Sequence, residues 1–318
     1  MLGQNFNDLS SYIDFLDKIG DLKRISTEVD PELEISEISS KTIEDNGPAL
    51  LFENVKGSSF PVATNLFGSE ERLRVSLGCN PKELGEEILS FAEKAMPPKL
   101  DNLFKSFPFI KRLTNFRSKE QAFNSPCQQI QDEITLEDLP IIKCWPEDGG
   151  KFITMGLTIT ESPISKKPNM GMYRLQMHDK EKLGMHWHPH KGGATHYHEA
   201  RQLGQDFPAA IVLGGDPSLI FAAIAPLPEN INELVFSASL KRNPITMCIA
   251  VCSNLRVPAN AEFLIEGTVP LDKTMLEGPF GDHFGYYSME GYFPYMDVKT
   301  ITRKHNAIFP ATVVGRPP

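Results

Sequence analysis

The pattern of apolar residues changes along this chain, and the later part is a long succession of β-rich segments. These segments are rich in β-branched and aromatic residues and lie at 152–160, 170–178, 209–213, 246–252, 261–269 and 295–302. Many short strands separated by turn residues are typical of an antiparallel barrel or sandwich. Helical periodicity interrupts them at 194–203, 218–225 and 231–240. The later part is therefore expected to be β-rich with a few helices.

The first part of the chain mixes helical and extended patterns. A first helix is predicted by apolar residues at helical spacing before Gly20, namely Leu9, Tyr12, Ile13, Leu16 and Ile19. Asp30 as cap and Pro31 in the first turn predict a second helix, which follows a short strand at 22–25. Further strands are expected at 49–55 and 60–66, and further helices at 69–77 and 81–95.

These patterns predict the α+β class with two domains. We expect a small N-terminal α+β domain over residues 1–125 and a β-rich domain over residues 126–318. Pro97-Pro98 and the polar segment 115–129 look like the connection between them.

Composition and charge exclude several classes of function. A formal net charge of -9 without a run of Lys or Arg argues against a nucleic-acid partner. Five cysteines without a C-x-x-C pair indicate a reducing compartment. The start of the chain is charged where a signal peptide would be apolar, and the apolar region 207–228 is broken by Asp216 and prolines. We expect a soluble cytoplasmic protein.

Histidines are concentrated in one segment, KLGMHWHPHKGGATHYHE, at 182–199. If 185–190 is extended, His186, His188 and His190 lie on one face, although Pro189 disturbs the regularity. Three imidazoles on one face suit zinc or copper, which makes a zinc hydrolase one hypothesis. The alternative is a set of partly exposed polar residues beside a glycine-rich loop.

Two acids, Glu277 and Asp282, stand among glycines and aromatic residues in EGPFGDHFGYY. Apolar surroundings raise the pKa of a carboxyl group and can leave it protonated, ready to donate a proton to a carbanion. A surface turn with solvated acids is the alternative. Arg174, in NMGMYR, carries a guanidinium that suits a carboxylate or phosphate, although an arginine in a strand is commonly part of a surface ion pair.

Taken in order, these segments resemble the UbiD family of decarboxylases. The resemblance also includes GPALLFENVKG (47–57), NLFGS (65–69), PCQQ (126–129), CWPEDGG (144–150), LEGPFGDHFGYY (276–287) and GRPP (315–318). It implies that the β-rich domain is a split β-barrel like that of flavin reductases and that it binds prenylated FMN. In that family a divalent metal, usually manganese, bridges the flavin phosphate to the protein, with potassium nearby.

The resemblance also assigns roles to individual residues. It implies that the metal ligands are Asn169, His190 and Glu233. The cofactor-binding residues that it implies are Met172, Tyr173, Arg174, His186, Trp187, His188, Lys191 and Gly192. The catalytic residues that it implies are Arg174, Glu277 and Asp282, and the proton donor is one of the two acids.

The reaction implied is the non-oxidative decarboxylation of an aromatic acid. Asp at position 282 favours 3-polyprenyl-4-hydroxybenzoate on the way to ubiquinone, or a related acid of menaquinone synthesis. A flavin prenyltransferase would supply the cofactor. A polyprenyl tail would favour loose contact with the inner membrane. The family forms homo-oligomers through a C-terminal domain, which we expect to be absent from these residues.

Two further readings stay open. The same residues would serve a decarboxylase or carboxylase of another phenolic or aromatic acid. An inactive, truncated remnant that binds flavin or a partner is the other.

Overall fold

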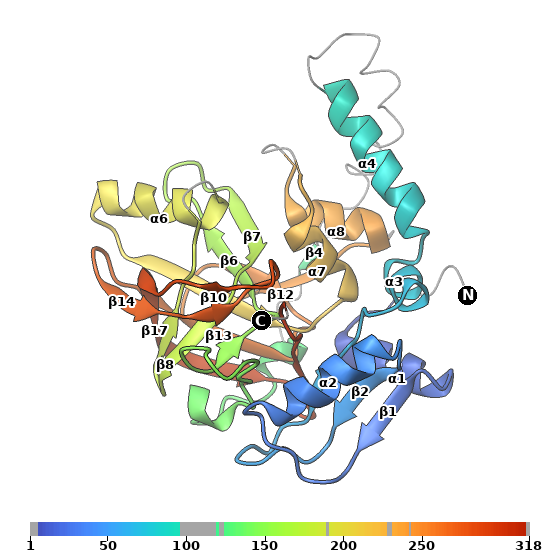
Figure 1. The fold of residues 1–318 in the computed structure, drawn as a ribbon. Helices are drawn as coiled ribbons and strands as arrows, with labels where there is room; N and C mark the ends of the chain where they lie inside the picture. Colours follow the sequence, from blue (N-terminus) through green and yellow to red (C-terminus); the bar gives the residue numbers. More distant parts are fainter. Residues whose placement is uncertain are drawn as a thin grey trace.

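The computed structural model describes residues 6–95, 119–120, 124–188, 191–227, 231–241 and 243–315. Helices and sheets are both present, as the α+β prediction requires, with the early elements gathered on one side and the later strands on the other (Figure 1). Within the described ranges, none of the helices has the length and apolar character needed to span a bilayer.

The N-terminal part is built on a small sheet. Its strands follow the order β1 (Leu22–Ile25), β2 (Ala49–Phe52), β3 (Val62–Thr64) and β18 (Phe309–Pro310). The helices of this part are α1 (Leu9–Lys18), α2 (Glu34–Glu44), α3 (Glu70–Leu77) and α4 (Pro81–Ala95). Because β18 pairs in parallel with β3, the end of the described chain completes the sheet formed by its beginning. The domain boundary at 125 stays a prediction.

The start of α2 differs from the sequence prediction. The helix begins at Glu34, and its N-cap is Leu33, at φ 70 and without a side-chain cap. Asp30 instead accepts a hydrogen bond from the Glu32 backbone at 2.9 Å and pairs with Lys56 at 2.8 Å. The prediction of Asp30 as the helix cap is therefore wrong, because its carboxylate stabilises the turn that precedes the helix.

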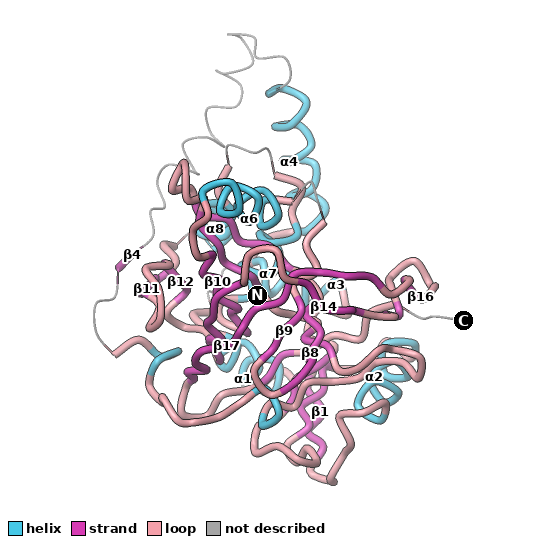
Figure 2. Tube along the Cα trace, turned by 90° about the vertical axis from the view of Figure 1, so that its left-hand side faces the viewer, coloured by secondary structure: helices cyan, strands magenta, loops and turns pink. Residues whose placement is uncertain are grey.

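The later strands form one large sheet in the described residues. Its order is β5 (Phe152–Ile153), β8 (Leu175–Asp179), β9 (Lys182–Gly184), β17 (Gly291–Arg303), β13 (Phe263–Val269), β10 (Phe207–Leu213), β6 (Leu157–Glu161) and β7 (Pro168–Met172), with β14 (Thr274–Glu277) on β17. Figure 2 shows β8, β9 and β17 side by side. The path does not close between β5 and β7, as expected of a split barrel.

Helices cover the β7 end of this sheet. α6 (Gly192–Leu203) packs on β6 and β7, whereas α7 (Pro217–Ile224) and α8 (Glu233–Lys241) pack on each other and on β7. The short strands β4 (Lys119–Glu120), β11 (Thr246–Ile249) and β12 (Arg256–Pro258) form a third sheet, and β15 (Phe280–Gly281) pairs with β16 (Tyr287–Ser288). The strand β7 therefore contacts three helices, α6, α7 and α8.

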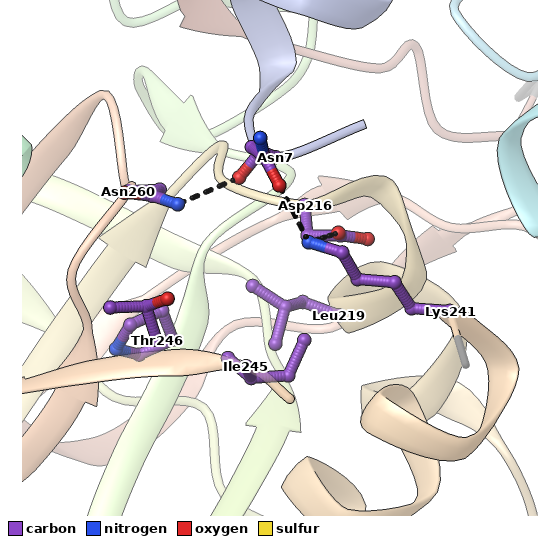
Figure 3. Close-up of a pocket in the computed structure, with 8 residues that line it drawn as sticks. Asn7, Asp216, Leu219, Lys241, Ile245, Thr246 and Asn260 are labelled. Atoms are coloured by element: carbon purple, nitrogen blue, oxygen red, sulfur yellow. Dashed lines mark hydrogen bonds and ion pairs between the residues drawn. The ribbon is translucent and has the colours of Figure 1, made fainter. Parts of the chain in front are cut away.

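A buried ion pair anchors the N-terminal segment to this region (Figure 3). Lys241 Nζ lies 2.7 Å from Asp216 Oδ2, and the two side chains are 7% and 6% exposed. Lys241 also donates to Asn7 Oδ1 at 3.3 Å, and Asn260 donates to the Asn7 carbonyl at 3.0 Å. The adjoining cavity holds only about 10 Å³, so it can take no organic ligand.

We expect Lys241→Ala to lower the free energy of unfolding by about 3 kcal/mol, because Asp216 would remain as a buried charge without its cation. Lys41→Ala, which removes a pair between side chains that are 75% and 69% exposed, is the control and should change stability by less than about 1 kcal/mol. Urea unfolding measures both, and equal losses would contradict the expectation.

Candidate active site

The three residues predicted to be catalytic lie together. Arg174 stands between β7 and β8, Glu277 ends β14, and Asp282 follows β15. Arg174 Nε donates to Glu277 Oε1 at 2.9 Å, and its Nη1 lies 3.8 Å from Asp282 Oδ2. The guanidinium also lies over the Phe280 ring, 4.8 Å from its centroid. One cation is therefore shared by two carboxylates and an aromatic face.

The two acids occupy different surroundings. Glu277 is fully buried. Its Oε1 accepts a hydrogen bond from Arg174 Nε and lies 2.8 Å from His186 Nδ1. Its Oε2 contacts no hydrogen-bond partner among the described residues. Asp282 is 28% exposed and accepts the His283 backbone N–H at 2.6 Å. A buried carboxylate needs such donors, because removing it from water unpaired costs several kcal/mol.

Two residues that the sequence analysis missed hold the segment carrying both acids. Gln176 Oε1 accepts the Gly278 N–H at 2.8 Å, while its amide donates to the Gly149 carbonyl at 2.9 Å. Asp148 Oδ1 accepts the Gly281 N–H at 2.7 Å, and burial raises the pKa of Asp148. The acidic residue beside two glycines in CWPEDGG was a signal that could have identified Asp148.

Close backbone contacts hold the same segment. A Cβ on Gly149 would lie 1.9 Å from the Gly278 carbonyl oxygen. A Cβ on Gly315, at φ +64, would lie 2.0 Å from the Asp282 carbonyl oxygen. The motif CWPEDGG and the first residue of GRPP therefore pack against LEGPFGDHFGYY, which explains why these strings carry glycine there.

Two of the three residues predicted to bind metal, Asn169 and Glu233, lie at the junction of β7, α6 and α8. Glu233, the first residue of α8, accepts the Met170 N–H at 3.3 Å through Oε2, and burial raises its pKa. Asn169 Nδ2 is buried without a partner in the described part of the chain. A Cβ on Gly192 would lie 2.0 Å from Asn169 Oδ1, so any other residue there would displace the Asn169 side chain. His190 lies outside the described residues.

The side chains of Asn169 and Glu233 offer amide and carboxylate oxygens, which are the donors that a hard divalent cation prefers. Both residues therefore fit a cation that binds through oxygen.

Two of the predicted cofactor-binding residues, Tyr173 and Gly192, lie beside Asn169. Tyr173 folds back over Gly171, and burial raises the pKa of its hydroxyl. Lys191 is exposed and starts α6, and its N–H donates to the His188 carbonyl at 3.0 Å. Met172 packs against the core, and His188 is exposed.

Trp187 differs from the other predicted cofactor residues in where its side chain lies. The indole packs in the core, with ring centroids 5.6 Å from those of Tyr197 and Phe207. Any contact of this position with a flavin would come from its backbone.

The histidines of 182–199 do not form one group in the fold. His186 contacts Glu277 and meets the His188 ring edge-on, whereas His196 Nδ1 lies 3.0 Å from Thr160 Oγ1, and burial lowers the pKa of His196. The described residues contain no group of three His, Cys, Asp or Glu side chains that could hold a metal. His190, the third histidine of the zinc-hydrolase hypothesis, lies outside the described residues, and within them that hypothesis has no three-ligand site.

A larger cavity, of about 480 Å³, lies away from this site. It is lined by residues of the N-terminal sheet and of the 303–308 segment, namely Arg24, Leu51, Glu53, Ser59, Phe60, Pro61, Arg303, His305, Asn306, Ala307 and Ile308. None of the predicted site residues lines it.

Comparison with models of protein families identifies the family of the chain. The model described as the 3-octaprenyl-4-hydroxybenzoate carboxy-lyase Rift-related domain, UbiD, matches residues 119–317, and that of the N-terminal domain of the same enzyme matches residues 13–92. The chain belongs to the UbiD family.

Solved structures of UbiD-class enzymes share the fold. Vanillic acid decarboxylase of Sedimentibacter hydroxybenzoicus in closed form is 26% identical, with a TM-score of 0.84, over 99% of this chain and 65% of that one. The UbiD-class enzyme HmfF of Pelotomaculum thermopropionicum in complex with FMN is 25% identical, with a TM-score of 0.83, over 96% and 65%. An evolved dimeric form of HmfF in complex with prFMN is 25% identical, with a TM-score of 0.83, over 97% of this chain and 68% of that one. This UbiD chain thus spans 65% of the length of the first two.

We expect Gly149→Ala to lower the free energy of unfolding by about 2 kcal/mol, because the new methyl group would overlap the Gly278 carbonyl and displace the acid-bearing segment. Gly85→Ala is the matched control: a Cβ there meets no atom within 4 Å in α4, and alanine should stabilise that helix by up to about 1 kcal/mol. Thermal and urea unfolding compare the two, and a Gly149 variant as stable as the control would refute the close packing.

Proposed function

We propose that this UbiD chain carries the flavin site and the catalytic residues of a non-oxidative decarboxylase, a carboxy-lyase that acts on an aromatic acid. The supporting observation is the buried ion pair of Arg174 and Glu277, with Asp282 beside the same guanidinium. An arginine that already has one carboxylate on Nε retains N–H groups for a second, and a substrate carboxylate fits them.

The roles of the residues follow from their surroundings. Arg174 binds and orients the carboxylate that leaves as CO2, and Glu277 holds Arg174 in place. The carbon that loses CO2 must gain a proton, and we assign its delivery to Asp282. This acid is partly exposed, so solvent can return its proton, whereas Glu277 Oε1 already accepts two N–H donors. Prenylated FMN, when bound, supplies the electrophilic centre that takes up the electron pair of the broken bond.

The proposed cofactor site combines the flavin with a divalent cation. We assign manganese, with potassium nearby, to Asn169, His190 and Glu233, where the cation would fasten the flavin phosphate. The flavin would be surrounded by the proposed cofactor-binding residues Met172, Tyr173, His186, His188, Lys191 and Gly192. Trp187 would contribute its backbone. A flavin prenyltransferase would supply the cofactor.

The proposed substrate is 3-polyprenyl-4-hydroxybenzoate, or a related acid of menaquinone synthesis. The name of the matching family model supports the first choice, since it names the octaprenyl acid. Another phenolic acid is the second candidate, because the similar enzyme of Sedimentibacter acts on vanillic acid. A homo-oligomer in the cytoplasm, loosely bound to the inner membrane through the substrate's tail, stays a prediction.

Co-expression with a flavin prenyltransferase tests the cofactor site. We expect purified protein to contain manganese by elemental analysis and a flavin with the mass of prenylated FMN. Asn169→Ala and Glu233→Ala should each lower retained flavin by about tenfold or more, because each removes an oxygen ligand. Asn243→Ala, an exposed asparagine, is the control. Equal flavin content in all four proteins would refute the metal assignment.

Asp282→Asn tests the proton donor. We expect kcat with vanillic acid or a 3-prenylated 4-hydroxybenzoic acid to fall by about a hundredfold or more, because an amide cannot deliver the proton. Flavin content should stay constant. Asp179→Asn, which changes a carboxylate 44% exposed, should leave kcat unchanged. Wild-type protein that retains the flavin and turns over neither acid would overturn the proposed function.

A further inference from the structure

His186 is in contact with the buried acid. Glu277 Oε1 accepts Arg174 Nε at 2.9 Å and lies 2.8 Å from His186 Nδ1. A carboxylate that is paired with the Arg174 guanidinium has no hydrogen of its own to give, so Nδ1 of His186 is the donor. The contact therefore sets the tautomer of His186.

Packing holds the His186 ring in this orientation. The residue follows β9, and its ring centroid lies 4.1 Å from that of Phe293 on β17. The His188 ring meets it edge-on at 5.0 Å. The His186 side chain is 12% exposed, so its hydrogen bond to Glu277 is little screened by solvent. The imidazole is thus fixed by an aromatic ring on one side and a carboxylate on another.

We propose that His186 is a positioning residue for decarboxylation, which fixes the Glu277 carboxylate so that Glu277 can hold Arg174 toward the substrate carboxylate. This inference rests on the proposed function. Arg174 and His186 both contact Glu277 Oε1, whereas Oε2 contacts no hydrogen-bond partner among the described residues, so these two contacts set the orientation of the carboxylate. With Arg174 as the remaining donor, the carboxylate would turn more freely about its last bond and would hold the guanidinium less firmly.

Other titratable groups also act near Glu277. Arg174 and Asp282 adjoin it directly or through the guanidinium, and His178 on β8 faces its charge. Burial lowers the pKa of His178, so this histidine adds little positive charge at neutral pH. His188, exposed beside His186, has no hydrogen bond to Glu277 among the described contacts. Substitution of His186 therefore tests its contact with Glu277 separately from the contacts of the other charged groups.

Two variants separate positioning from packing. His186→Asn places an amide N–H near the position of Nδ1, whereas His186→Phe keeps the ring against Phe293 and removes the donor. Positioning predicts kcat within about threefold of wild type for the asparagine variant and lower by about tenfold to a hundredfold for the phenylalanine variant. A packing role predicts the reverse order, which would overturn the proposal. Flavin content is measured in each variant, so that kcat is calculated per bound flavin.

A second measurement needs neither flavin nor substrate. Nitrogen-15 NMR of labelled histidines in the cofactor-free protein, with His186 assigned through His186→Asn, shows which ring nitrogen carries the hydrogen. We expect a hydrogen on Nδ1, because this nitrogen lies 2.8 Å from Glu277 Oε1 and donates to it. A His186 ring with its hydrogen on Nε2 alone would overturn the proposal. If no aromatic acid is turned over, the proposed function fails, while this spectrum still decides whether His186 donates to Glu277.

Discussion

A carboxylate with no exposed surface depends on its neighbours for its charge, and the candidate site is organised around that requirement at Glu277. Arg174 lies in the connection between β7 and β8, and His186 lies in the segment that follows β9. Both contact Glu277 Oε1. The backbone around Glu277 is held in turn by Gln176 and Asp148, which accept the N–H groups of Gly278 and Gly281. Displacement of any of these segments would leave charge buried without a partner.

The elements with strong local signals could be predicted from the sequence. Helix α1 has a clear amphipathic period and a glycine just beyond its end, and the structure ends it at Lys18. Helix α2 was predicted, but its start was not. The Asp30 carboxylate could cap the helix or stabilise the preceding turn, and its contact with Lys56 favours the turn. The strand β18 is two residues long and pairs with a segment far away in the sequence, so no local pattern marks it.

The residues of the candidate site also differ in whether a local sequence pattern could identify them. The acids and Arg174 could be singled out from their setting among glycines and aromatic residues, and their placement together is what the family resemblance implied. The histidines could not be sorted from spacing alone, because His186 and His196 take their partners, Glu277 and Thr160, from other strands. Such long-range partners are fixed by the register of the sheet, which local periodicity does not contain.

The position of β18 bears on how the chain is made. Synthesis from the N-terminus delivers β1, β2 and β3 early, but the strand that covers the free edge of β3 leaves the ribosome some 245 residues later, as 309 minus 64 gives. Until then that edge exposes unpaired N–H and C=O groups, which can recruit strands of other chains. The nascent chain is thus most prone to aggregation during translation of its second half, when a chaperone that shields strand edges would protect it most.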